Sequence, residues 1–138
     1  MSAICSYKIL PGFKLVMGKY KGSISENEVI SLKDKILHDK NFSWEYNVLD
    51  DFTEADFNLS ERGLEIALTW LKNNFSSTRR SAILTRTPDQ VVAVTLFKYF
   101  EKNQLPMNIQ IFSTLSHALQ WIGISEENVE DIAEFIYE

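Results

Sequence analysis

Few side chains in this sequence are placed to do chemistry, and the clearest are two adjacent carboxylates, Asp50 and Asp51. They end an alternating stretch that begins at Trp44 and is typical of a strand. Ligands of open α/β folds bind at the carboxyl edge of the sheet, so we expect a binding edge here, with Asp56 in the polar loop that follows. Adjacent strand residues point to opposite faces, however, and two such carboxylates do not share one proton or metal ion. Capping or hydrogen bonding of the loop is the favoured role, and we expect no metal site.

A second set, Arg86 and Thr87, lies at the next predicted strand-to-helix turn. A helix N-terminus and a guanidinium together can receive an anion. The same residues also suit a simpler role, in which Thr87 caps the helix and Arg86 pairs with the acidic loop. The simpler role is favoured because no glycine-rich phosphate loop is present.

The remaining reactive residue types occur singly. Neither His38 nor His117 has a nucleophile motif or a second metal ligand at helical spacing. The lone cysteine, Cys5, has no partner for an intrachain disulfide and suits a small strand residue. No set of nucleophile, base and orienting residue is visible, so we expect no catalytic residue and rank a hydrolase or transferase that uses Asp50, Asp51 and Arg86 last among the possible functions.

The apolar spacing predicts alternating strands and helices that would position these side chains. The expected strands cover 4–10, 13–20, 44–51, 81–85 and 106–112, and the first two are joined by a turn at Pro11-Gly12, where glycine tolerates a positive φ. Five helices are expected. Two begin after the caps Ser25 and Ser60, and the other three cover 88–102, 115–122 and 125–137. The fold class is therefore α/β, with a mixed, mostly parallel sheet of four or five strands opened by an N-terminal hairpin and flanked by helices.

The predicted helix 88–102 is apolar around more of its circumference than one core-facing stripe requires. We expect the acidic C-terminal helix, 125–137, to cover the excess. Two alternatives remain open: a homodimer surface, or an apolar ligand cleft around Val92, Leu96 and Phe100.

Composition limits the remaining classes. The chain has 138 residues, 45% of them hydrophobic, which suits a single domain over 1–138 with a genuine core. A net charge of −5 disfavours nucleic-acid and anionic-membrane partners. Charged residues interrupt every apolar run before it reaches membrane-spanning length, and the first residues lack the pattern of a signal peptide. We expect a cytoplasmic protein without membrane insertion.

Four motifs, in this order and spacing, carry a resemblance to a known family. A hairpin ends in Tyr20-Lys21-Gly22 before a capped helix, and three later strands read NVLDDF, RRSAILT and IQIFSTLSHALQWI, the last running into a short helix. Together they resemble the STAS-like domains related to bacterial anti-sigma-factor antagonists, including a lipid-carrier-like branch. The resemblance covers about 4–122 and leaves the acidic C-terminal helix outside it.

The resemblance implies a cofactor-free bacterial module that binds a protein partner in regulation. Asp50, Asp51, Asp56, Ser60, Arg86 and Thr87 would then form or regulate the interaction face. In regulatory members an Asp-Ser pair begins the helix after the third strand, and phosphorylation of the serine breaks binding to a kinase. Here Asn58-Leu59 occupies that position and Ser60 follows it, so Ser60 is either the regulatory serine or only a helix cap. The lipid-carrier-like branch implies the alternative function, a carrier or sensor of a small apolar ligand held between the sheet and helix 88–102.

Overall fold

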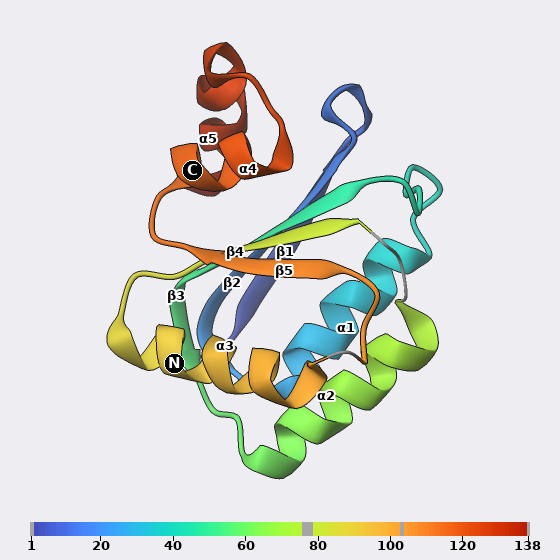
Figure 1. Cartoon of the computed structure of the whole chain (residues 1–138), viewed down its shortest axis with the longest axis vertical. Coiled ribbons are helices and arrows are strands. Elements are labelled where there is room, and N and C mark those ends of the chain that lie inside the picture. The colour runs from blue at the N-terminus through green and yellow to red at the C-terminus, as the bar shows by residue number, and fades with distance from the viewer. Residues whose placement is uncertain (1, 76–78, 103, 138) are drawn as a thin grey trace.

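The computed structural model describes residues 2–75, 79–102 and 104–137 and contains one five-stranded sheet (Figure 1). The strands lie in sequence order across the sheet, and they are β1 (Ile4–Leu10), β2 (Leu15–Ile24), β3 (Asn47–Phe57), β4 (Arg80–Leu84) and β5 (Asn108–Phe112). Only the β1–β2 hairpin is antiparallel; the three other pairs are parallel. The predicted fold class is confirmed, because helices separate the parallel strands and bring each back to the same edge.

Helices cover both faces of this sheet (Figure 1). The three-helix face packs against α1 (Glu26–Leu37), α2 (Glu61–Asn74) and α3 (Pro88–Glu101). The two-helix face packs against α4 (Leu115–Ile122) and α5 (Val129–Tyr137). Each face buries its own apolar cluster, so the domain has two cores separated by the sheet.

The predicted helix starts are confirmed where side-chain caps satisfy the free backbone N–H groups. Ser25 and Glu28 form a reciprocal capping box at α1, and Thr87 and Gln90 form another at α3. The Ser60 hydroxyl accepts a hydrogen bond from the Gly63 N–H at the start of α2. These bonds fix where each helix begins and how its apolar stripe meets the sheet.

The helix end predicted at Gly123 is also confirmed. Gly123 has a φ of 102°, in the left-handed region, and ends α4. The Ile124 N–H then donates to the Leu119 carbonyl at 2.9 Å, and Ile124 packs into the core of the two-helix face.

Two local predictions near the N-terminal hairpin are wrong. The connection is a 3-10 helix over Pro11–Phe13, and the positive φ of 51° belongs to Lys14 rather than to Gly12. The predicted polar loop after Asp51 is strand as far as Phe57, because β2 also extends beyond residue 20 and supplies backbone partners, pairing Ile24 with Phe57. Long-range pairing here outweighs the acidic, turn-like composition.

The position predicted for the C-terminal helix is wrong as well. α5 packs beside α4 on the opposite side of the sheet from α3, so it leaves the excess apolar surface of α3 uncovered. The helical start also differs, since a 3-10 helix over Glu126–Asn128 precedes α5 and the Ser125 side chain makes no capping hydrogen bond. No helix in the described part of the chain is long and apolar enough to cross a bilayer.

Candidate functional site

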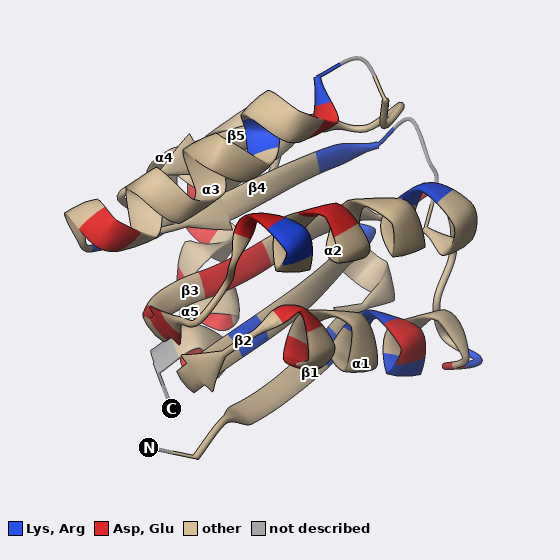
Figure 2. Ribbon diagram, turned by 90° about the horizontal axis from the view of Figure 1, so that it is seen from below, with Lys and Arg blue, Asp and Glu red and all other residues tan. Residues whose placement is uncertain are grey.

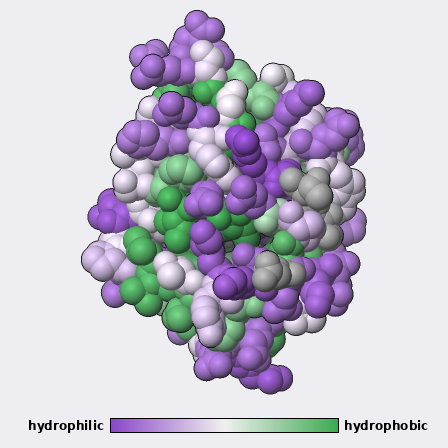
Figure 3. Space-filling model, viewed as in Figure 1, coloured by the Kyte–Doolittle hydropathy of each residue, from purple (hydrophilic) through white to green (hydrophobic). Residues whose placement is uncertain are grey.

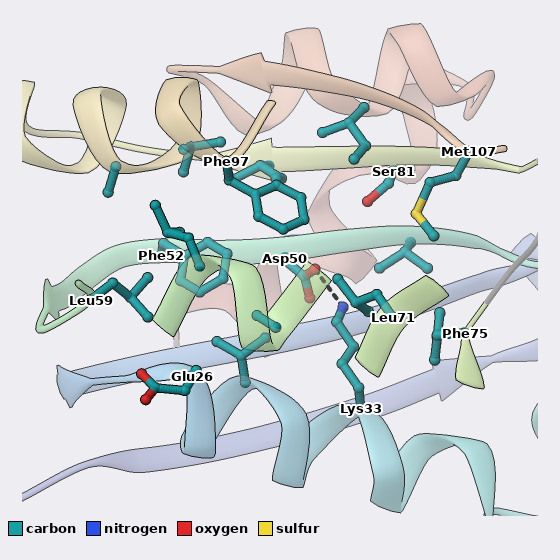
Figure 4. A pocket seen from close by; sticks show the side chains of 18 of the residues that line it. Glu26, Lys33, Asp50, Phe52, Leu59, Leu71, Phe75, Ser81, Phe97 and Met107 are labelled. Atoms are coloured by element: carbon teal, nitrogen blue, oxygen red, sulfur yellow. Dashed lines mark hydrogen bonds and ion pairs between the residues drawn. The ribbon is translucent and has the colours of Figure 1, made fainter. Parts of the chain in front are cut away.

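A pocket lies inside the three-helix face, between the sheet and helices α1, α2 and α3 (Figure 4). Its volume is about 90 Å³, several times the roughly 10–15 Å³ that one ordered water requires. Most of the wall is apolar and includes Phe52, Leu71, Phe75, Val94, Phe97 and Met107. The pocket is therefore a mostly apolar cavity whose lining includes a few charged side chains.

A buried ion pair, Lys33–Asp50, crosses the pocket from α1 to β3 (Figure 4). The Lys33 Nζ lies 2.5 Å from the Asp50 Oδ2, and both side chains are almost fully buried. Gly18, which pairs with Asp50 on β2, leaves room for the carboxylate, since a Cβ there would lie only 2.6 Å from the Asp50 Oδ1. That second oxygen, Oδ1, is buried without a hydrogen bond.

Arg79, just before β4, also lines the pocket, and it is only 6% exposed. Its Cζ lies over the Phe75 ring, 4.2 Å from the centroid, and within 6 Å of the centroids of Phe42 and Trp44. All three guanidinium nitrogens are buried without a hydrogen-bond partner in the described structure. Burial lowers the pKa of Arg79 to about 10, and the nearby Asp50 carboxylate opposes that shift.

A third incompletely satisfied group, the Tyr20 hydroxyl, lies beside the pocket. Its ring stacks on Phe52 with centroids 4.4 Å apart, and its hydroxyl is buried without a partner in the described residues. Burial, followed by the charge of Asp50, raises the pKa of Tyr20 well above its ordinary value. The phenol is therefore neutral at physiological pH.

The charges of the pocket do not balance around Arg79. Lys33 and Asp50 neutralise each other, which leaves one positive charge on Arg79. The other acidic lining residue, Glu26, is half-buried at the opposite end of the pocket from Phe75, the ring beneath Arg79 (Figure 4). Buried polar groups are normally paired, so an unpaired buried guanidinium is an unusual feature of this pocket.

The two predicted carboxylates separate, as strand alternation requires. Asp50 faces the pocket, whereas Asp51 is buried on the other side of β3, where its Oδ1 accepts hydrogen bonds from the Thr53 N–H and hydroxyl. Asp56 is exposed on β3. Of these three acids, only Asp50 belongs to the site, and the interaction loop expected around them is part of the sheet.

The structure also leaves Arg86, Thr87 and Ser60 outside the pocket lining. The Arg86 Nε donates to the Thr53 carbonyl at 3.2 Å, which joins the start of α3 to β3. Thr87 and Ser60 cap their helices, as their simpler roles require.

The cleft expected on helix 88–102 exists, but different residues line it. Val92 and Leu96 are exposed, by 58% and 46%, while Phe100 is half-buried against the core. The lining residues of α3 are Ala93, Val94 and Phe97. One residue of a helix turns the side chain by about 100°, so an error of one position rotates the cleft-facing stripe toward solvent.

Sequence reasoning missed Lys33, Arg79 and Tyr20. Lys33 carried a signal, because it lies four residues after Val29 on the inner stripe of α1. Arg79 carried none, since Arg79 and Arg80 stand side by side and only the fold buries the first while leaving the second exposed. In the described residues no group of three or more His, Cys, Asp or Glu side chains is arranged to hold a metal ion.

Comparisons with known proteins support the fold alone. No protein-family model matches the sequence, and no curated protein matches it. The structure is similar to the crystal structure of an uncharacterized DUF3478-family protein with a SpoIIAA-like fold from Shewanella loihica PV-4. The match has a TM-score of 0.59 and 19% sequence identity and covers 88% of this chain and 94% of that one. The chain therefore has the SpoIIAA-like, or STAS-like, fold.

Proposed function

We propose that this protein binds a small, largely apolar ligand in the pocket of the three-helix face and acts as a carrier or sensor without catalysing a reaction. The observation that carries the proposal is the pocket itself, which lies between the sheet and α3 and has a mostly apolar wall. A well-packed core leaves few voids larger than a water molecule, so a chamber of this size in a small domain favours an occupant.

The wall between α2, α3 and the end of β3 offers a route to solvent. Phe57, Leu59, Ala93 and Phe97 line the pocket there and are only half-buried. Ser81 is a potential nucleophile in the lining, but no histidine among the described lining residues accompanies it as a base, and Lys33 and Asp50 are paired with each other. Apolar access and the lack of an activated nucleophile among these lining residues both favour binding over catalysis.

Native mass spectrometry of freshly purified protein, together with titration of the neutral fluorescent probe N-phenyl-1-naphthylamine, tests this proposal. We expect a retained small molecule or saturable binding of the probe. Ala93→Phe should block binding, because it fills the pocket from α3. The matched control, Ala133→Phe, changes a half-buried helix alanine on the two-helix face and should leave binding intact. Absence of both the retained molecule and probe binding would contradict the proposal.

A second candidate function is binding of a regulatory protein partner, and the uncovered surface of α3 favours it. Val92, Leu96 and Tyr99 are exposed, and the stretch between Asp89 and Lys98 is uncharged (Figure 2). Hydrophobic side chains gather on the surface where α3 lies (Figure 3). Patches of this kind often mark protein interfaces, either with another protein or with a second copy.

Leu96→Glu tests this second function. Light scattering after size exclusion would report a homodimer, and affinity capture from the host would report a different partner. We expect Leu96→Glu to abolish either association, whereas Ser60→Asp should preserve the helix cap and test phosphorylation at that position. A monomer that captures the same proteins before and after Leu96→Glu would contradict this function.

A further inference from the structure

We infer that the ligand is a small apolar monocarboxylate whose carboxylate pairs with Arg79 inside the pocket. This inference rests on the proposed ligand-binding function and specifies the chemical class of the ligand. It depends on three features of the pocket: an unpaired cation, a nearby fixed anion, and an apolar wall.

The unpaired cation calls for an anion. Only 6% of Arg79 is exposed to solvent, and none of its three side-chain nitrogens has a hydrogen-bond partner in the described structure. Its only favourable partners there are the aromatic rings and the more distant charge of Asp50. A ligand anion would supply the hydrogen bonds that water supplies to an exposed guanidinium.

The fixed anion limits the ligand to a single negative charge. Asp50 uses one oxygen for Lys33 and keeps the other, Oδ1, unpaired. Because Lys33 is already matched by Asp50, the surplus positive charge at this end of the pocket is one. A dianion would oppose the Asp50 carboxylate in a low-dielectric site, where like charges repel strongly.

The placement of the guanidinium favours a planar carboxylate. The Arg79 Cζ sits over the face of Phe75, and the N–H donors of a guanidinium lie in the plane of the group. The ring contact uses none of these donors as a hydrogen bond, and all three nitrogens are without a partner in the described structure. Two parallel N–H donors match the two oxygens of one carboxylate, which is why arginine is preferred over lysine for this recognition.

The apolar wall defines the body of the ligand. From Asp50 the pocket continues past Phe52 toward Leu59, and Phe97 closes it from α3 (Figure 4). These walls offer dispersion contacts and burial to a short alkyl or aromatic group. Because a cavity of about 150 Å³ holds only a benzene molecule, the pocket would take the carboxylate and first carbons of a longer acid, and its tail would extend through the half-buried wall near Leu59. Octanoate is a suitable probe for this arrangement, and 1-octanol is its neutral counterpart with the same chain.

The experiment titrates octanoate, 1-octanol and octyl phosphate into the full chain at pH 8 and measures Kd by calorimetry or NMR. We expect octanoate to bind roughly tenfold or more tightly than 1-octanol, because Arg79 forms a stronger hydrogen bond with the charged carboxylate than with the neutral hydroxyl. Octyl phosphate, largely a dianion at this pH, should bind more weakly than octanoate.

Arg79→Met and Arg80→Met form a matched pair of variants. Arg80 is the exposed neighbour, packed over Trp121, and does not line the pocket. Arg79→Met should remove the preference for octanoate and retain binding of 1-octanol, while Arg80→Met should retain the preference. Circular dichroism checks that each variant is folded. If a variant does not fold, the affinities of the wild-type protein for the three probes still test the inference.

Three results would overturn the inference. Equal affinity of wild type for octanoate and 1-octanol would reject a carboxylate ligand and leave the proposed ligand binding intact. A preference for octanoate that persists in folded Arg79→Met would reject Arg79 as its partner, and tighter binding of octyl phosphate would reject the monoanion. Failure of all three probes and of N-phenyl-1-naphthylamine would instead contradict the proposed function itself.

Discussion

Both faces of the sheet bury a lysine and an aspartate, but in the described structure the buried side-chain atoms without a hydrogen-bond partner lie on the three-helix face. On that face the Lys19 Nζ donates to the Phe135 carbonyl at 3.2 Å, and the Asp51 Oδ1 accepts two hydrogen bonds from Thr53. On the three-helix face Lys33 and Asp50 pair with each other, and one oxygen of Asp50 stays unpaired. The Tyr20 hydroxyl and all three Arg79 nitrogens are also unpaired in the described structure.

The two faces also differ in packing, because the pocket lies between the sheet and the helices of the three-helix face. Ala118 and Leu119 of α4 are fully buried against the two-helix face, whereas Ala67 and Leu71 of α2 border the pocket on the other. The unsatisfied groups and the pocket between the sheet and α1, α2 and α3 therefore lie on the same face. Proteins commonly depart from full satisfaction at functional sites, and this contrast is why we propose a site on the three-helix face.

The largest effect that can break this comparison is expected from Asp50→Asn. The amide would leave Lys33 and Arg79 as two buried cations without an anion. We expect a loss of about 3–5 kcal/mol in the free energy of unfolding, measured by urea denaturation. Asp51→Asn, the control on the two-helix face, retains an oxygen that can accept from Thr53 and should cost only about 1 kcal/mol. Equal losses would show that the two faces do not differ in this way.

An intermediate effect is expected from a matched pair of enlargements, Ala118→Leu and Ala67→Leu. Ala118 is fully buried and does not line the pocket, so the larger side chain should lower the free energy of unfolding by about 1–3 kcal/mol. Ala67 borders the pocket, and leucine there should cost less than about 1 kcal/mol because it fills existing space. Thermal unfolding of both variants checks the order, and a greater loss for Ala67→Leu would contradict it.

The smallest effect is expected at Ser60, which caps α2 in the wall of the three-helix face but does not line the pocket. Ser60→Ala removes the cap on the Gly63 N–H and should lower the free energy of unfolding by about 1 kcal/mol. Ser60→Asp keeps an acceptor at the cap and should remain near wild type in urea denaturation. Loss of ligand or partner binding by Ser60→Asp without loss of stability would assign Ser60 a regulatory role instead.

Much of the fold was predictable because the decisive signals are local. Caps at Ser25 and Thr87 and the left-handed end at Gly123 fixed helix boundaries through bonds made within a few residues. The parallel direction of β2 to β5 followed from the alternation of strands and helices. The extension of β3 to Phe57 was not predictable in this way, since its backbone partners lie on β2, more than thirty positions earlier, as in the pairing with Ile24.

The candidate site was predictable only in part. Strand alternation correctly separated Asp50 from Asp51, and a cleft beside helix 88–102 was anticipated with its lining stripe misplaced by one position. The sequence by itself determined the order of the elements and most of their ends, through local hydrogen bonds and apolar periodicity. Only the tertiary structure decided that α5 lies away from α3, that Arg79 is buried and Arg80 exposed, and that Lys33 meets Asp50. The reason is physical: burial and pairing depend on which distant segments pack together, and local sequence does not encode that.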